Sequence, residues 1–518
     1  MEKIGGDQVK QIDTIICSLN KKISKEFKIA FVAAVVVGMI AHGYMFANKL
    51  PNYDDLRTID GFGATFKLGR WFLWFLGAVA WHLDFVYSLP WINGLITVLF
   101  IALSAGFMAD LLKIRSCIGN ILLGAALITF PSWTGSFFFM YTVPYYAVAM
   151  FMMVLAVYLC TYYKWGGICS IVLMACSMGI YQAYLPFAAT LYVVILLMRL
   201  FDEEDTVRVI KCAFYYLINI IVGVILYFIV TKLTLLVTGQ ELTHTKGIDT
   251  MGQFDVSRVS EIVGIIFRNI IGVFCRNDLE ISYNYVTKLM YLLLFFSSVY
   301  CIVRRVVWEW KRKDYLRCAS ILVLVAAFEI AVNGIYIMCS DGIYSLMYFS
   351  YVFLMLFPLC MLEHSEQREK SKFLLGVEYV TVFGLTIGIA SYCHFANAQY
   401  LSVELSYKQA ESYCTTLITQ IKSVAGYSDQ MPVAFAGHDI EDGTLYENDV
   451  MDAVLFSGRN VTLVEAYSRE YLLRYYCGFD PDYVPADTID AVQIAAMPVY
   501  PDAGAIQIID GVVVIRLE

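Results

Sequence analysis

Two adjacent carboxylates follow the first apolar stretch of the chain, in the segment Pro51-Asn52-Tyr53-Asp54-Asp55. When water is partly excluded from such a pair, the pKa of one carboxyl rises, so Asp54 or Asp55 could act as a general base. Two aspartates could also bind a divalent cation. A hydrated loop is the ordinary alternative for this dipeptide, and the residues that follow weigh against it.

Cations and an aromatic ring come soon after these carboxylates. Arg57, Lys67 and Arg70 could hold a phosphate group, and Trp71 begins an aromatic stretch that could stack on a sugar or a lipid. An anchor of Lys, Arg and Trp at the membrane interface is the alternative, and it explains Lys67 better than Arg70. Carboxylates, cations and an aromatic wall together indicate a transferase site.

A second polar group, Tyr181-Gln182, lies between two apolar segments. The amide of Gln182 can donate and accept hydrogen bonds, which suits sugar hydroxyls or a phosphate oxygen. Hydrogen bonding between helices explains it equally well. We include both residues in the candidate substrate-binding set. Three isolated acids are weaker candidates, namely Asp84, Glu329 and Asp341, and Glu329 would need a partner inside the membrane.

The elements that must position these residues are membrane spans. Of the 518 residues, 59% are hydrophobic and 16% are charged, whereas soluble domains have about 45–50% and about 25%. A soluble fold of this composition would expose too much apolar surface. The net charge of -8 and the low charge density exclude nucleic-acid-binding and disordered classes. We therefore expect a mainly α, polytopic helical membrane protein.

Apolar runs long enough to cross a bilayer predict about eleven helices. They lie near residues 29–47, 89–112, 117–131, 144–163, 166–181, 183–200, 212–237, 286–303, 317–338, 343–362 and 374–395. The third and fifth runs are short, so the expected count is ten to twelve.

Lysine and arginine predict the orientation and the division of the chain. They are concentrated in residues 1–28 and in alternate loops, so the N-terminal arm is expected in the cytoplasm and the C-terminal tail outside. No cleavable signal peptide is evident, because the first apolar run is too long. We expect a cytoplasmic arm (1–28), a transmembrane glycosyltransferase domain (29–395) with long outer loops (48–89 and 238–285), and an extracytoplasmic α/β domain (396–518).

The outer segments carry their own patterns. The tail begins with an amphipathic helix and ends with two β-rich runs around Asp510-Gly511, which is a strong hairpin signal. Within the second long loop, the apolar residues of Val256–Phe274 fall on one face, as is typical of a helix lying in the membrane interface. The two cysteines of the tail, Cys414 and Cys477, could pair or remain free thiols.

Taken in order, these features resemble one family. They are Asp54-Asp55 after the first helix, Gly69-Arg70-Trp71, Tyr181-Gln182 and the closing Tyr500-Pro501…Ile506…Asp510-Gly511…Val514-Ile515-Arg516-Leu517. Together, over most of the chain, they resemble the bacterial O-antigen glucosyltransferase family often called Gtr type II. That family is similar in plan to the GT-C class of polytopic glycosyltransferases, which take a sugar from a polyprenyl-phosphate carrier on the outer membrane face, generally with inversion.

The resemblance implies roles for the candidate residues. Asp54 or Asp55 would deprotonate an acceptor hydroxyl, and Arg70, with Arg57 or Lys67, would hold the carrier phosphate. Gln182 would contact the sugar or the phosphate. The donor would be a polyprenyl-phosphate-linked sugar and the acceptor a cell-surface polysaccharide or O-antigen, in the bacterial cytoplasmic (inner) membrane. A divalent cation stays open as a cofactor, because arginine could neutralise the phosphate without one.

Two other functions fit a polytopic membrane protein. A transporter or flippase of lipid-linked sugars would scatter polar residues through several spans and often has related halves. Here the polar residues gather at the expected outer face, and no repeat is evident. A non-catalytic scaffold would make the Asp54-Asp55 loop expendable. A nucleotide-dependent mechanism lacks its usual signature, a glycine-rich phosphate loop.

Overall fold

The structure is a computed structural model. It describes Thr14, Ser18 and residues 20–243, 259–275, 280–339, 343–365, 372–437 and 463–517. The weaker candidate Asp341 lies outside these residues.

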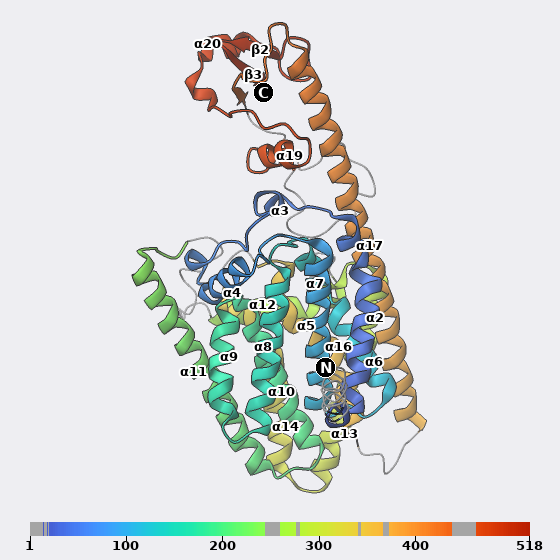
Figure 1. The fold of residues 1–518 in the computed structure, drawn as a ribbon. Coiled ribbons are helices and arrows are strands. Elements are labelled where there is room, and N and C mark those ends of the chain that lie inside the picture. Colours follow the sequence, from blue (N-terminus) through green and yellow to red (C-terminus); the bar gives the residue numbers. More distant parts are fainter. Residues whose placement is uncertain are drawn as a thin grey trace, which may run out of the picture.

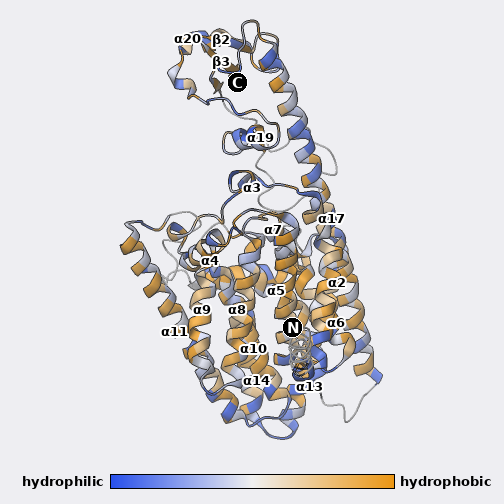
Figure 2. Cartoon of the chain, in the orientation of Figure 1, coloured by the Kyte–Doolittle hydropathy of each residue, from blue (hydrophilic) through white to orange (hydrophobic). Residues whose placement is uncertain are grey.

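A bundle of apolar helices makes up most of the molecule (Figures 1 and 2). Eight helices in the described ranges are long and apolar enough to cross a membrane: α2 (Lys25–Asn48), α5 (Pro90–Leu111), α8 (Val143–Tyr162), α10 (Leu185–Phe201, extended by the 3-10 turn η2 at Gln182–Tyr184), α11 (Thr206–Thr238), α13 (Tyr285–Lys311), α14 (Tyr315–Val332) and α17 (Lys372–Ser423). The prediction of a mainly α, multi-pass membrane protein is confirmed.

The remaining three predicted spans are broken or short. Helix α6 (Cys117–Thr129) and helix α7 (Pro131–Phe137) form a pair bent by 43°. The cause is Pro131, which lacks an N–H and keeps the preceding Phe130 out of the helical conformation, at φ -55° and ψ 132°. Helices α9 (Gly166–Met178) and α16 (Val352–Glu363) are shorter than a full span. By length, the described residues therefore contain eight spans, or nine with the bent pair, rather than ten to twelve.

Close packing near the start of the chain depends on small residues. Helix α2 packs against both α5 and α6. At the contact with α6, a Cβ atom on Gly124 would lie 2.3 Å from the backbone oxygen of Ala30. Only glycine permits this approach, because small residues let helix backbones pack closely in a membrane.

Short elements connect the spans at the end of the bundle that faces the C-terminal part (Figure 1). They are α3 (Tyr53–Arg57), η1 (Phe66–Leu68), α4 (Trp71–His82), α12 (Val259–Cys275), η5 (Glu280–Ser282), α15 (Gly334–Met338), η6 (Ser345–Met347) and η7 (Phe349–Tyr351). Helix α12 confirms the amphipathic helix predicted in the second long loop, within the described residues. It buries Ile262 and Val273 and leaves Val263 and Phe267 exposed, which suits a helix that also faces lipid.

The C-terminal part stands on one long helix. Helix α17 continues unbroken through residue 396, where the sequence suggested a domain boundary, and rises from the bundle to a small sheet (Figure 1). Its apolar positions Cys414, Leu417 and Ile421 are buried in the core beneath that sheet. Cys414 and Cys477 are free thiols.

The sheet has three strands, β1 (Val433–Ala436), β2 (Ile506–Ile509) and β3 (Val512–Arg516), in the order β1-β3-β2. Strands β1 and β3 are parallel, whereas β2 and β3 form the antiparallel hairpin predicted around Asp510-Gly511. Both turn residues have positive φ, 49° and 82°, as a two-residue type I′ hairpin requires. Helices α19 (Arg469–Tyr475) and α20 (Ala491–Ala496) and the turn η9 (Ala486–Thr488) complete this part.

Candidate active site

A pocket of about 920 Å³ lies between the helical bundle and the C-terminal part. Its walls come from residues 53–70, α4, the connection between α7 and α8, the first turn of α8, the segment after α9, residues 343–346 and one residue near α19. Aromatic rings dominate the lining: Tyr53, Phe62, Trp81, Phe139, Tyr141, Tyr146, Tyr181, Tyr344 and Tyr467. Its charged lining residues are Asp54, Arg57, Asp60 and Arg70. Such a pocket can bind an anionic, ring-shaped ligand by stacking and by charge.

Asp54 faces this pocket from the first turn of α3. The side chain of Asn52 caps the helix by accepting a hydrogen bond from the backbone N–H of Asp54 at 2.9 Å. The hydroxyl of Tyr467 donates to Oδ1 of Asp54 at 2.8 Å. The carboxylate is half-buried and remains part of the pocket surface. It can therefore accept a proton from a group bound in the pocket.

Asp55 is turned away from the pocket and is buried, with 6% of its surface exposed. Its carboxylate accepts backbone hydrogen bonds from Asn52 (3.1 Å), Tyr141 (2.9 Å) and Met140 (3.4 Å). Burial raises the pKa of Asp55 to about 7, the backbone N–H groups oppose this shift, and the charge of Asp54 adds to it. Asp55 thus joins α3 to the loop before α8.

Arg70 lies half-buried at the start of α4, beside two tyrosines that stack on each other. Its Nη1 donates to the hydroxyl of Tyr146 at 3.2 Å, and its guanidinium carbon lies 5.2 Å from the ring centre of Tyr181. The two rings stack with their centres 4.6 Å apart. Its Nε is buried and lacks a hydrogen-bond partner among the described residues. The rings fix the guanidinium without neutralising it, so Arg70 keeps its charge for an anion.

Arg57 is exposed at the rim of the same pocket. Its guanidinium carbon lies 4.7 Å from the ring centre of Tyr467. A hydrogen bond with Tyr467 is the largest influence on the pKa of Arg57 and raises it. Since Tyr467 also bonds Asp54, this tyrosine of the C-terminal part connects an acid and a cation of the pocket.

Three sequence-predicted binding residues lie outside the pocket lining. Lys67 is exposed, and its backbone oxygen accepts a hydrogen bond from Thr243. Trp71 packs on Gly179, where a Cβ atom would lie 2.8 Å from its indole ring. Gln182 donates through Nε2 to the backbone oxygen of Leu68 (2.7 Å) and to the hydroxyl of Tyr227 (2.9 Å). The structure therefore places all three beside the pocket rather than in its lining, and their role in substrate binding stays a prediction.

Several lining residues were missed from the sequence. Tyr141 and Tyr146 lie in an aromatic-rich stretch that resembles an ordinary membrane-interface belt, so their type alone does not mark a site. Tyr344 and Tyr467 are far from the acidic loop in sequence, and no local pattern singles them out. Asp60 follows the aspartate pair and could have been found by its spacing. In the part of the chain that the structure describes, no group of three or more His, Cys, Asp or Glu is arranged to hold a metal ion.

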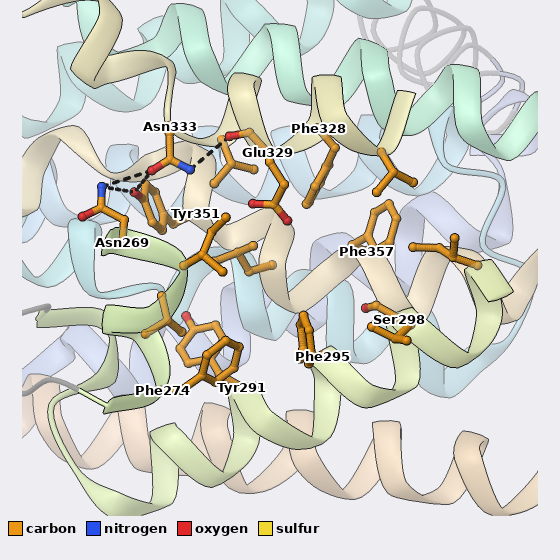
Figure 3. A pocket seen from close by; sticks show the side chains of 17 residues that line it. Asn269, Phe274, Tyr291, Phe295, Ser298, Phe328, Glu329, Asn333, Tyr351 and Phe357 are labelled. Carbon is orange, nitrogen blue, oxygen red and sulfur yellow. Dashed lines mark hydrogen bonds between the residues drawn. The ribbon is translucent and has the colours of Figure 1, made fainter. Parts of the chain in front are cut away.

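A second cavity, of about 150 Å³, lies inside the bundle around Glu329 (Figure 3). The carboxylate of Glu329 points into it between phenylalanine rings such as Phe295 and Phe328 (Figure 3). The nearby amide of Asn333 donates to the backbone oxygen of Glu329 at 3.0 Å rather than to its carboxylate. This cavity is small and lined mainly by apolar groups, and no cation lines it. It therefore lacks the groups that would bind a sugar phosphate.

A comparison with known protein families gives a match that includes most of the pocket of about 920 Å³. Residues 43–357 match the model of a family described as Glucosyl transferase GtrII. This range covers more than half of the chain and every residue that lines the pocket except Tyr467. No curated protein and no solved structure matches the chain.

Proposed function

Since the chain belongs to the glucosyl transferase GtrII family, we propose that it moves a sugar, glucose by the family's name, from a polyprenyl-phosphate carrier to a cell-surface polysaccharide or O-antigen. Membership makes it a glycosyltransferase, and its apolar helices make it a multi-pass membrane protein. The observation that supports this donor best is the pocket. It combines the carboxylate of Asp54, the half-buried guanidinium of Arg70 and aromatic walls at one end of an apolar bundle.

Asp54 acts as the base in this proposal. Asp54 lines the pocket, whereas the carboxylate of Asp55 is occupied by three backbone N–H groups. Asp54 takes the proton from an acceptor hydroxyl, and the oxygen of that hydroxyl forms a bond to the anomeric carbon of the sugar. The bond from this carbon to the carrier phosphate breaks at the same time. A single displacement of this kind inverts the anomeric configuration.

In this proposal the guanidinium of Arg70 stabilises the negative charge that develops on the leaving phosphate. Its guanidinium is held by Tyr146 and Tyr181, so little reorganisation is needed when the negative charge grows. Arg57 supplies a second cation at the rim of the pocket. Two arginines that neutralise the phosphate leave no required role for a divalent cation in this scheme.

The lipid part of the donor explains the position of the pocket. A polyprenyl chain stays in the bilayer, so its phosphate and sugar are available only where the apolar bundle ends. The pocket lies at that end and includes Trp81, whose side chain is largely exposed. We infer that this end faces the outside of the bacterial cytoplasmic membrane, where lipid-linked donors replace nucleotide sugars.

The test is Asp54→Asn, with Asp487→Asn as the matched control at an exposed position of η9, outside the pocket. Removal of a general base typically slows a reaction by about 10²- to 10⁴-fold. We therefore expect Asp54→Asn to abolish sugar transfer to the surface glycan, measured by mass spectrometry of the glycan, at a normal protein level. Asp487→Asn should retain transfer. Normal glycan from cells that contain only Asp54→Asn would refute the assignment of Asp54 as the base.

The same variant separates the proposal from lipid-linked sugar transport. A flippase would leave its precursor on the inner leaflet when it fails. A transferase that lacks its base leaves the precursor accessible on the outer leaflet, where an added glycosidase can remove the sugar. Protection of the precursor from that glycosidase in Asp54→Asn cells would favour transport.

A further inference from the structure

A second large pocket, of about 670 Å³, lies at the opposite end of the bundle. Helix α10 connects the two ends: the chain enters it at Tyr181-Gln182 beside the first pocket and leaves it at Phe201, which lines the second. Seventeen helical residues span roughly 26 Å. The two pockets are therefore separated by nearly the thickness of a bilayer's hydrocarbon core.

The second pocket is lined by more cations than its carboxylates neutralise. Its basic residues are Arg304, Arg305 and Lys311, from the last two turns of α13, and Arg312, which directly follows that helix. Arg305 pairs with Glu309 at 2.6 Å, and Arg312 pairs with Glu203 at 2.6 Å. These two ion pairs leave the charges of Arg304 and Lys311 available to a ligand.

Arg304 and Lys311 are arranged to act together. With Trp308 they occupy positions i, i+4 and i+7 of α13, so all three lie on one face of the helix. The Nη1 atom of Arg304 is buried and has no hydrogen-bond partner in the described part of the chain. A buried guanidinium N–H without a partner is costly, and a phosphate oxygen would satisfy it.

Apolar side chains border these cations. Val303 and Val307 line the pocket and are 54% and 46% exposed, and Trp308 is 46% exposed beside them. Exposed valines on a membrane-spanning helix face lipid, and tryptophan is enriched where lipid meets water. A ligand of this pocket therefore carries an anionic head next to an apolar chain.

We propose that the pocket formed by Arg304, Trp308 and Lys311 binds the phosphate headgroup of an anionic membrane lipid. Basic pockets between membrane helices bind lipid headgroups in this way. The inference is independent of the sugar-transfer reaction, because no residue of the first pocket takes part.

The test uses the full-length protein in a neutral detergent and native mass spectrometry to count bound lipids. The probes are dioctanoyl phosphatidylglycerol, which is anionic, and dioctanoyl phosphatidylcholine, which has no net charge. We expect the wild-type protein to prefer phosphatidylglycerol. Arg304→Gln combined with Lys311→Gln should weaken that binding on the order of 30-fold, since each cation near a lipid phosphate contributes about a factor of five.

The matched control is Arg208→Gln combined with Lys211→Gln. These two cations are exposed near the start of α11, at the same end of the bundle, and lie outside the pocket. The control should bind phosphatidylglycerol as the wild type does. An equal loss in both double variants would show a general effect of surface charge and would overturn the proposal. A wild-type protein that does not distinguish the two lipids would overturn it too.

Two further measurements keep the result interpretable. Inorganic phosphate is added as a competitor: displacement of the lipid at millimolar phosphate would assign the pocket to a soluble phosphate group and refute the lipid. If the double variant fails to fold, Lys311→Gln alone, at an exposed position, replaces it. This single variant should still bind phosphatidylglycerol about five-fold more weakly than the wild type. Unchanged binding would contradict the proposal.

Discussion

Asp54 and Asp55 are adjacent in sequence, yet their carboxylates face different surroundings. In α3 one side chain points to the pocket and the other points back to the backbone of the next loop. Successive residues of a helix lie about 100° apart, so two neighbours cannot share one environment. The pair that attracts attention in the sequence therefore separates into a candidate base and a structural carboxyl.

The raised pKa of Asp55 predicts how stability varies with pH. The folded chain binds this proton more tightly than the unfolded chain, because the pKa rises from 3.8 to about 7 on folding. The contribution of Asp55 to the free energy of unfolding is therefore most favourable at acid pH. It decreases as the pH rises from 3.8 to about 7 and is constant above that. Across this interval the free energy of unfolding falls by roughly 4 kcal/mol on account of Asp55.

We expect the melting temperature of the wild type to fall from pH 5 to pH 8 relative to that of Asp55→Asn, measured by intrinsic fluorescence in detergent. The Asn variant cannot ionise, so the difference between the two curves isolates Asp55 from all other titrating groups. Parallel curves for the two proteins would contradict the prediction.

At the scale of elements, the pocket depends on how the segment before α4 is attached to the bundle. Gln182 in the turn η2 bonds the backbone of Leu68 and the hydroxyl of Tyr227 on α11, so three segments meet at one amide. The neighbouring Arg70 begins α4 and enters the pocket. An amide outside the pocket thus positions a guanidinium inside it.

Substitution Gln182→Leu tests this role. It leaves a backbone oxygen and a hydroxyl without their partner, which typically costs about 1–3 kcal/mol, so the melting temperature should fall. Gln493→Leu, at an exposed position of α20, is the control and should melt as the wild type does. A variant that loses sugar transfer without any change in melting temperature would instead indicate that Gln182 contacts substrate.

At the scale of the whole molecule, the long helix α17 places the C-terminal part at the same end of the bundle as the pocket (Figure 1). Tyr467 from this part closes one side of the pocket through its contacts with Asp54 and Arg57. The lining of the pocket therefore includes residues from both the bundle and the C-terminal part, which a division at residue 396 would separate.

Reporter fusions test the orientation. The Lys- and Arg-rich end of the bundle is expected in the cytoplasm. Alkaline phosphatase, which is active only outside the cytoplasm, should be active when fused after residue 518 and inactive when fused after Lys313. Green fluorescent protein should give the reverse pattern at the same two positions. Phosphatase activity at Lys313 would show that the orientation is inverted.

The sequence by itself determined the class of the molecule and pointed to the segment that lines the candidate pocket. Apolar runs of bilayer length can only be helices in lipid, and the scarcity of charge made the segment with Asp54 and Arg70 conspicuous. The hairpin at Asp510-Gly511 could also be predicted. A two-residue turn of this kind needs positive φ at both positions, and Asp and Gly adopt that conformation readily. These are local properties, which composition and spacing encode directly.

Only the tertiary structure decided which candidates face the pocket. Asp55 and Gln182 have the right chemistry, but backbone groups far away in sequence occupy them. Tyr344 and Tyr467 enter the pocket from segments that no local pattern connects to it. A side chain's direction and its partners depend on contacts between distant segments, and those contacts exist only once the chain has packed.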